Sequence, residues 1–369
     1  MKKSLLALAV AGAFAAPLAL ADVKIGGEID VEAQSYNNGT KSGLQLNNTH
    51  TRWWVNNSDD IGGGNYVLAH FEIDQGASST SGINNRNSFI GLKGDWGMVK
   101  MGTEEGIYEQ LGYQVDAYHG AAGSAGNIVN GLGTYGASGG GHIFNNENLG
   151  ARRESGTISF VSAEMSGFNF KIDYSVKGPA SRAAPADNNG TTLQWGGYWG
   201  GTVGGGTGLR FGLGGIQVKN QGLISAGPGR SETDNGLRFT AGVSFGDFAI
   251  DGLLENNKWK DDSAGGVGEI KANHLWLQGT YNVPTGKVIV DIMKLGKTKL
   301  NGADQDKTAG KQFGVGYYHN LSKSSAAYVI YSKIANEDNA QFGMQEGGNV
   351  SPALGKDPSA IGVGLYTTF

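Results

Sequence analysis

Residues 22–35 of the chain read DVKIGGEIDVEAQS, and their side chains alternate between two chemical types. One parity is apolar: Val23, Ile25, Ile29, Val31 and Ala33. The other parity is charged or polar: Lys24, Glu28, Asp30, Glu32 and Gln34. Successive side chains of a β-strand point to opposite faces, so a period of two over this length predicts a strand with one apolar and one charged face.

The same alternation recurs to the end of the chain. Leu275 and Leu277, for example, alternate with Trp276 and Gln278. Beyond the first 21 residues no segment shows a sustained period of 3.6 residues. We predict sixteen strands, near residues 22–35, 48–57, 64–74, 85–94, 97–103, 155–162, 167–176, 190–200, 206–220, 233–245, 247–257, 268–282, 286–297, 309–320, 324–335 and 359–369.

The predicted connections alternate between short turns and longer loops. Seven turns are short, at 59–63, 94–97, 164–166, 201–204, 246, 284–285 and 321–323. Eight loops are long and rich in Gly, Asn and Asp, at 36–47, 75–84, 104–154, 177–189, 221–232, 258–267, 298–308 and 336–358. An outer-membrane barrel has short periplasmic turns and longer external loops, whereas a soluble sandwich has no reason to separate them. The pattern therefore predicts an all-β fold, a sixteen-stranded antiparallel transmembrane β-barrel.

Aromatic side chains gather near the predicted strand ends. They are Tyr66, Trp96, Phe168, Phe245, Phe248, Tyr281 and Tyr317. Girdles at the two membrane interfaces would place them there, and so would ordinary core packing. Both interpretations stay open from the sequence.

Composition agrees with a barrel whose interior is wet. The 369 residues include 64 Gly, 7 Pro and no Cys, and the mean hydropathy is −0.28. Polar residues at every second strand position make such a chain hydrophilic overall. Without its first 21 residues the chain has 27 basic and 33 acidic residues, a net charge of −6. A nucleic-acid partner is not expected, because it requires a basic surface.

The first 21 residues have the order of a secretory signal peptide. Lys2 and Lys3 precede an apolar run from Leu5 through Ala16, and Ala19-Leu20-Ala21 provides a small-x-small cleavage site. We expect residues 1–21 to be removed and residues 22–369 to form the pore domain. A membrane anchor helix is the weaker interpretation, because Pro17 interrupts the run.

Enzyme and cofactor motifs lack their structural context. Residues 131–136 match GxGxxG, but no strand and helix flank them, and glycine-rich chains produce such matches by chance. The six His are scattered without metal-binding spacing. We therefore expect no cofactor, no metal and no catalytic residues.

Several stretches resemble the general-diffusion porins of Gram-negative bacteria. These are TRWWV at 51–55 with DIGGG at 60–64, NRNSFIGLKGDWG at 85–97, VSAEMSGF at 161–168, and GLYTTF at 364–369. The terminal Phe369 on an alternating strand looks like the signal read by the barrel-assembly machinery. The family often ends in a more basic last strand than this one.

The resemblance implies a constriction formed by an in-folded third loop, here 104–154. By resemblance its acidic residues, Glu104, Glu105, Glu109 and Asp116, would face arginines on the barrel wall. Arg52 and Arg86 lie at matching wall positions, as do Arg152 and Arg153, of which one or the other would face the lumen.

Opposed acids and bases across a narrow wet pore would create a transverse field that favours polar solutes. The alternative for the loop acids is simple solvation. For Arg52 and Arg86 the alternative is structural ion pairing with the predicted lumen charges Glu28, Asp30, Glu32 and Glu72, which belong to a set that also includes Lys24.

The function that follows is a porin for passive diffusion of ions and small hydrophilic solutes, mildly preferring cations. The resemblance implies a homotrimer, and we expect contacts with outer-membrane lipid and lipopolysaccharide. A sugar-specific channel is the main alternative; it would use an aromatic slide, for which Trp54 and Trp276 have lumen parity. A barrel enzyme or a surface adhesin has less support.

Overall fold

The computed structural model describes residues 22–76, 83–118, 153–176, 190–219, 233–261, 268–344 and 350–369. The predicted signal peptide and most of loop 104–154, including Arg152, lie outside these residues. The described helices are α2 (Ile107–Tyr113) and the 3-10 turn η1 (Gly204–Gly206). The strands are β1 (Asp22–Asn37), β2 (Ser42–Asn48), β3 (Arg52–Gly62), β4 (Asn65–Asp74), β5 (Asn84–Gly94), β6 (Gly97–Glu105), β7 (Arg153–Ser162), β8 (Phe168–Val176), β9 (Thr191–Val203), β10 (Thr207–Lys219), β11 (Thr233–Phe245), β12 (Phe248–Asp261), β13 (Gly268–Val283), β14 (Gly286–Leu295), β15 (Lys299–Leu300), β16 (Ala303–Asp304), β17 (Gly310–Asn320), β18 (Ser325–Asn336) and β19 (Ser359–Thr368).

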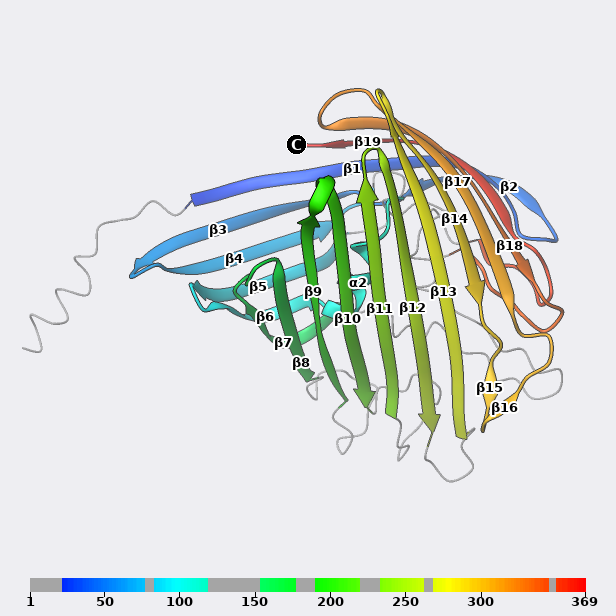
Figure 1. Cartoon of the computed structure of the whole chain (residues 1–369), viewed down its shortest axis with the longest axis horizontal. Coiled ribbons are helices and arrows are strands. Elements are labelled where there is room, and N and C mark those ends of the chain that lie inside the picture. The colour runs from blue at the N-terminus through cyan, green and yellow to red at the C-terminus, as the bar shows by residue number, and fades with distance from the viewer. Residues whose placement is uncertain are drawn as a thin grey trace, which may run out of the picture.

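The strands form one antiparallel sheet that closes on itself (Figure 1). Strand β1 pairs with β2 and β3 on one edge and with the last strand, β19, on the other. Three barrel strands are each divided into two segments, β2 with β3, β14 with β15, and β16 with β17, so nineteen segments make sixteen barrel strands. Closure leaves no free sheet edge, so the backbone N–H and C=O groups are paired within the sheet and the wall can lie in lipid.

All sixteen predicted strands are present, but some strands extend into predicted loops. Within 36–47, β1 continues to Asn37 and β2 begins at Ser42, around a turn in which Gly39 has a φ of 83°. The short hairpin of β15 and β16 falls within 298–308. In β2 the alternation is present, since Leu44 and Leu46 are 78% and 58% exposed, but it covers only a few residues. In β15 and β16 each strand has two residues, which is too short for a period of two to be recognised.

The two faces of the wall divide as the sequence predicts. Ile29 is 44% exposed on the outer face, whereas its neighbours Glu28 and Asp30 are 5% and 1% exposed. The same alternation continues through β8, β11, β14 and β17. The outer face therefore presents apolar side chains to lipid, and the charged face lines the interior.

Exposed aromatic side chains stack near the short turns. Trp96 stacks with Phe160 at 6.3 Å between ring centroids, and Phe248 stacks with Phe245 at 5.9 Å and with Tyr281 at 4.6 Å. Trp96, Phe245, Phe248 and Tyr281 are all more than two-fifths exposed, which favours an interfacial girdle over core packing.

Candidate functional site

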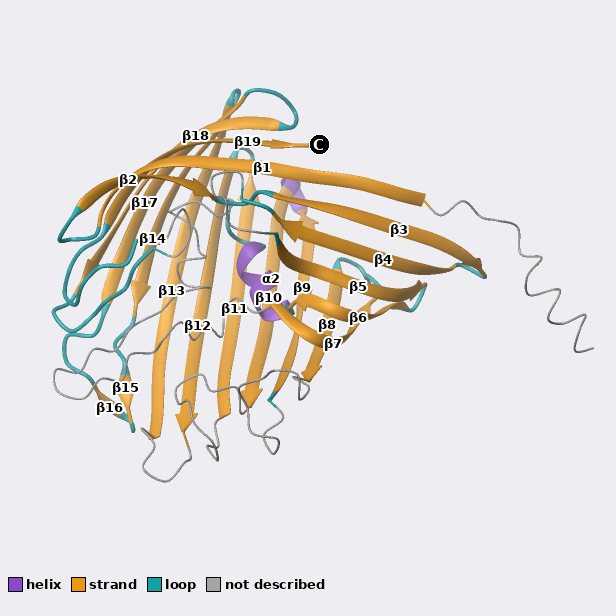
Figure 2. Ribbon diagram, turned by 180° about the vertical axis from the view of Figure 1, so that it is seen from behind, coloured by secondary structure: helices purple, strands orange, loops and turns teal. Residues whose placement is uncertain are grey.

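Helix α2 lies inside the barrel, against β8–β11 (Figure 2). Among the described residues, no helix has the length and apolar character needed to cross a membrane. The first backbone N–H groups of a helix have no partner within it. Here side chains of the barrel wall supply the acceptors: Asp173 Oδ2 accepts from Ile107 N at 3.0 Å, and Gln194 Oε1 accepts from Tyr108 N at 3.2 Å. The N-cap residue Gly106 has no side chain to do so. Barrel side chains therefore cap this helix.

Glycines on the inner face of the wall make room for α2. A Cβ atom at Gly212 or Gly214 would lie 2.7 or 2.5 Å from a methyl group of Leu111. A Cβ atom at Gly236 would lie 2.5 Å from the Tyr108 hydroxyl. Because such distances are shorter than carbon contacts allow, the helix can lie on this wall only where side chains are missing. We call Gly212, Gly214 and Gly236 the glycine bed.

Buried polar contacts fix the first turn of α2. The Arg238 guanidinium donates to the Tyr108 carbonyl and, at 2.9 Å, to Glu255 Oε2, and all three groups are buried. The Tyr108 hydroxyl donates to Asn257 Oδ1 at 3.1 Å. A buried charge is tolerated only with such partners.

The chain after α2 continues along the inner wall to β17. Ala117 N donates to Gln278 Oε1 at 2.9 Å, and Lys287 Nζ donates to the Ala117 carbonyl at 2.7 Å. Tyr118 is buried with Ile289 and Tyr318. We call residues 107–118 the inner strap. It contacts the wall from β8 to β17, and the remainder of the loop, 119–152, lies outside the described residues.

The two predicted wall arginines, Arg52 and Arg86, share an inner-wall ion cluster. Arg52 Nε lies 2.8 Å from Glu28 Oε1, and its Nη1 lies 3.5 Å from Glu72 Oε1. Arg86 Nε lies 2.5 Å from the same Glu72 oxygen. The side chains of Arg52 and Arg86 are 25% and 17% exposed, so they keep access to the interior. Arg52 and Arg86 therefore form ion pairs with wall carboxylates, which is the arrangement that Sequence analysis gave as the alternative.

Glu104 and Glu105 lie on the wall strand β6 and not on the loop, which corrects the sequence-based placement. Strand β6 runs two residues further than predicted because Glu104 and Glu105 pair with Glu154 and Arg153 of β7. Arg153 Nη2 lies 3.1 Å from Glu105 Oε1, and Arg153 faces the interior.

Glu104 is held by two buried cations. Its carboxylate contacts Lys100 Nζ, lies 3.4 Å from Lys171 Nζ, and accepts the Ser159 hydroxyl at 2.6 Å. Lys171 also lies 3.3 Å from Asp173, which caps α2. The ion pairs of the wall are thus connected to the inner strap.

Glu109 and Asp116 are the predicted loop acids that do lie on the strap. Glu109 is 5% exposed, and its Oε2 accepts no hydrogen bond from the described residues. Burial, and next the charge of Glu105, raise the pKa of Glu109 well above its ordinary range. Asp116 Oδ1 accepts the Tyr118 N–H at 2.9 Å.

The remaining predicted residues divide between the lumen and the barrel ends. Asp30 Oδ1 accepts the Tyr328 hydroxyl at 2.9 Å, and Glu32 Oε1 accepts Gln34 Nε2 at 3.1 Å. Lys24, in contrast, is not a lumen charge: its side chain is 72% exposed and it pairs with Asp22. The reason is that β19 pairs with β1 only from Glu28 onward, so the start of β1 projects past the barrel seam.

The last residue, Phe369, completes that seam. Its backbone N–H and carbonyl both pair with Gly27, each at 3.0 Å, and its side chain is 66% exposed.

The sequence did not reveal an apolar cluster on the inner wall. Trp276, Met293 and Leu295 are buried beneath Phe342 and Met344, which come from the loop after β18. Trp276 is 0% exposed, so it cannot serve as a step in an aromatic slide. The sequence shows Trp276, Met293 and Leu295 at inward positions of β13 and β14, but it does not show the segment that covers them.

A closed barrel with an apolar outer face, a charged inner face and a strap within it defines the class of transmembrane β-barrel channels. A family model described as Gram-negative porin matches residues 7–339, and the chain belongs to this family. It is an outer-membrane protein that forms a channel for passive diffusion.

Individual relatives agree with this assignment. The chain is 28% identical to outer membrane porin protein 32 of Delftia acidovorans over the whole of both chains. Among solved structures it is similar to an anion-selective porin from Comamonas acidovorans, with a TM-score of 0.74, 24% identity and coverage of 95% of this chain and 100% of that one. It is also similar to the trimer form of OmpT of Vibrio cholerae, with a TM-score of 0.64, 15% identity and coverage of 95% and 99%.

Proposed function

We propose that the inner strap forms the constriction of the channel, and that ions and small hydrophilic solutes pass between it and the inner-wall ion cluster. The observation that carries this proposal is the anchoring of 107–118 to the wall at both ends, through Arg238 and through Lys287. Single-channel recording of the purified, folded protein in planar bilayers tests it. We expect stable ohmic openings, and folded protein without conductance would contradict the proposal.

The charge of the interior supports a preference for cations. Twelve acidic and only three Lys or Arg side chains are buried among the described residues. Five half-buried cations, Arg52, Arg86, Arg153, Arg210 and Lys287, reduce this excess without removing it. A field of one sign inside a narrow pore raises the local concentration of the opposite ion. The reversal potential in a salt gradient measures this, and a value favouring anions, the preference of the similar Comamonas porin, would refute it.

The assembled protein, we propose, is a homotrimer of chains that begin at Asp22 after removal of residues 1–21. The trimer form of the Vibrio protein supports the stoichiometry. The mass of the native complex and the N-terminal sequence of the purified protein test both points.

The environment of the barrel follows from the same proposal. The terminal strand, ending in the seam residue Phe369, would be recognised by the barrel-assembly machinery, and the outer face would contact lipid and lipopolysaccharide. The channel carries no cofactor and catalyses no reaction in this proposal.

A further inference from the structure

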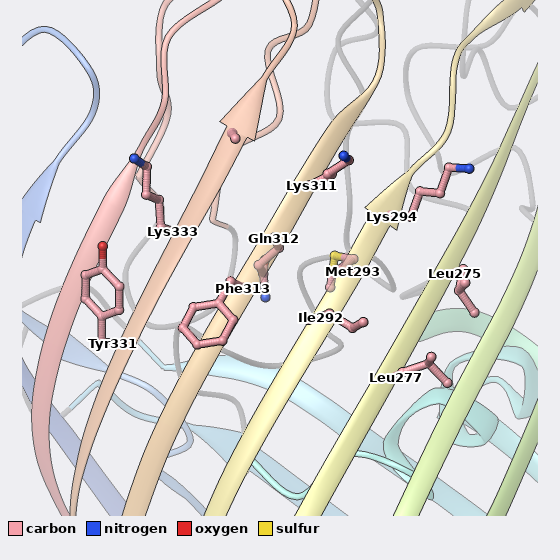
Figure 3. Close-up of a pocket in the computed structure, with 11 residues that line it drawn as sticks. Leu275, Leu277, Ile292, Met293, Lys294, Lys311, Gln312, Phe313, Tyr331 and Lys333 are labelled. Atoms are coloured by element: carbon pink, nitrogen blue, oxygen red, sulfur yellow. The ribbon is translucent and has the colours of Figure 1, made fainter.

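We infer that the outer face of β13, β14, β17 and β18 binds a phosphorylated lipid of the outer leaflet. Its phosphate would lie on Lys294, Lys311 and Lys333, and its acyl chains would fill the apolar groove beside them (Figure 3). We call these three residues the lysine row. The inference rests on the proposed contact of the outer face with lipopolysaccharide and on the long loops being outside the membrane, and it is independent of how the pore conducts.

The lysine row lies at the boundary between the apolar band and the external loops. Lys294 is next to last in β14, Lys311 is second in β17, and Lys333 precedes the end of β18 by three residues. All three are exposed on the outer face, since the buried residues Leu295, Gln312 and Ile334 beside them point inward. The ten residues of β14 match the roughly 9–11 that a strand needs to cross the hydrocarbon layer. The amines are therefore placed at the height of the outer-leaflet headgroups.

Within the described residues, no acidic side chain compensates the charges of the row. Lys294 and Lys311 are direct cross-strand partners, and like charges in that position repel. None of the three lysines forms an ion pair with any residue that the structure describes. The nearby outer lysines differ, because Lys258 and Lys271 both pair with Glu269, at 3.1 and 2.6 Å. An external anion would relieve the repulsion within the row.

The groove beside the row is apolar and open on the lipid side. It has a volume of about 690 Å³ and is lined by Leu275, Leu277, Ile292, Phe313 and Tyr331 on its outer face. Figure 3 shows Leu277, Ile292, Phe313 and Tyr331 on one side of the amines, toward the middle of the strands. Ile292 is 55% and Phe313 46% exposed. Amines above an apolar groove match an amphiphile with an anionic head and hydrocarbon tails.

A lipid fits this arrangement better than a free anion does. A free phosphate would use the amines and leave the groove empty, whereas an acyl chain in the groove places its own headgroup beside them. The lysine stems can lie along the apolar surface while their amines reach the polar boundary. A phosphate oxygen at that height would accept from two or three amines at once.

The test compares lipid binding by two matched triple variants. Bisphosphorylated lipid A is titrated into the purified, detergent-solubilised protein, and bound lipid is counted by native mass spectrometry. The test variant is Lys294→Gln/Lys311→Gln/Lys333→Gln. The control, Lys258→Gln/Lys271→Gln/Lys299→Gln, removes the same charge from lysines that already have acidic partners. Unchanged single-channel conductance in both variants shows that the barrel has folded.

We expect the test variant to bind lipid A about 100-fold more weakly, since each basic residue at a membrane surface contributes about a fivefold factor. The control should stay within threefold of the parent protein. We expect the parent to prefer lipid A over its dephosphorylated form at least tenfold, and inorganic phosphate not to compete at equal concentration. A loss below tenfold in the test variant, an equal loss in the control, no preference for the phosphorylated lipid, or competition by inorganic phosphate would each overturn the inference.

Discussion

The inner wall has two sectors of different chemistry. From β1 to β8 it carries a network of ion pairs, in which Arg52, Arg86 and Arg153 contact carboxylates of the wall. From β9 to β18 it carries glycines and apolar side chains covered by the inner strap and by the loop after β18, and the ion pairs Arg238–Glu255 and Arg210–Asp251 lie among them. Both sectors have the same strand periodicity, so the difference arises from what the loops cover.

This difference separates two roles that a pore wall has to combine. The packed sector holds the strap in place because the glycine bed leaves room for Leu111 and Tyr108, and because a few buried polar contacts join the strap to the wall. The charged sector leaves its groups partly exposed, and it is the part of the wall that a passing ion meets. Substitutions in the first sector should alter the position of the strap, whereas substitutions in the second should alter which ions pass.

The largest effect is expected from a side chain placed in the glycine bed. Gly214→Leu would put carbon atoms where Leu111 now lies, and overpacking of this kind costs about 1–3 kcal/mol. In a fraction of the molecules, α2 would then lie away from the wall. We expect chymotrypsin to cleave at least about fivefold faster after Tyr108 and Tyr118, both buried in the parent protein, since 1 kcal/mol corresponds to about that factor.

The matched control is Gly200→Leu on β9, where a Cβ atom meets nothing closer than 3.9 Å. It should be cleaved like the parent protein and show the parent's single-channel noise. If Gly214→Leu were cleaved no faster than Gly200→Leu, the glycine bed would not be what holds the strap.

The strands could be predicted from the sequence, and the division into sectors could not. Alternation fixes the parity of each side chain, and Glu28 and Asp30, which share the polar parity, are both buried. It says nothing of contacts such as that between Tyr108 and Asn257, 149 residues apart. One signal was available in the sequence. Gly212 and Gly214 alternate with the outward Phe211 and Leu213. A strand with large outer side chains and no inner side chains indicates that another segment of the chain packs on its inner face.

A smaller effect is expected in the charged sector. Arg52→Gln/Arg86→Gln removes two half-buried cations and takes from Glu28 and Glu72 their guanidinium partners. The permeability ratio of cations to anions should rise about fivefold, the factor that corresponds to about 1 kcal/mol for charges in hydrated surroundings. Reversal potentials in a potassium chloride gradient measure it.

The control for this pair is Lys299→Gln, which removes a cation from the exposed hairpin of β15 and β16. Its permeability ratio should equal that of the parent protein. A ratio that changes equally in both variants would mean that the overall charge of the protein, and not the inner-wall ion cluster, sets ion preference.

The smallest effect is expected where the two sectors meet, at Glu109. Burial and the neighbouring Glu105 raise its pKa, so the docked strap binds this proton more tightly than a free chain would. Stability from this source is therefore complete at low pH and is lost as the pH rises through the raised pKa, where the carboxyl ionises. We expect cation preference to increase by less than about twofold over that range, because one carboxylate is added to many.

Glu109→Gln should remove this dependence while retaining the docked strap, and Glu164→Gln, in an exposed short turn, should leave it unchanged. A pH profile that is identical in Glu109→Gln and in the parent protein would assign the titration to another group and leave the strap without a proton-sensitive contact to the charged sector.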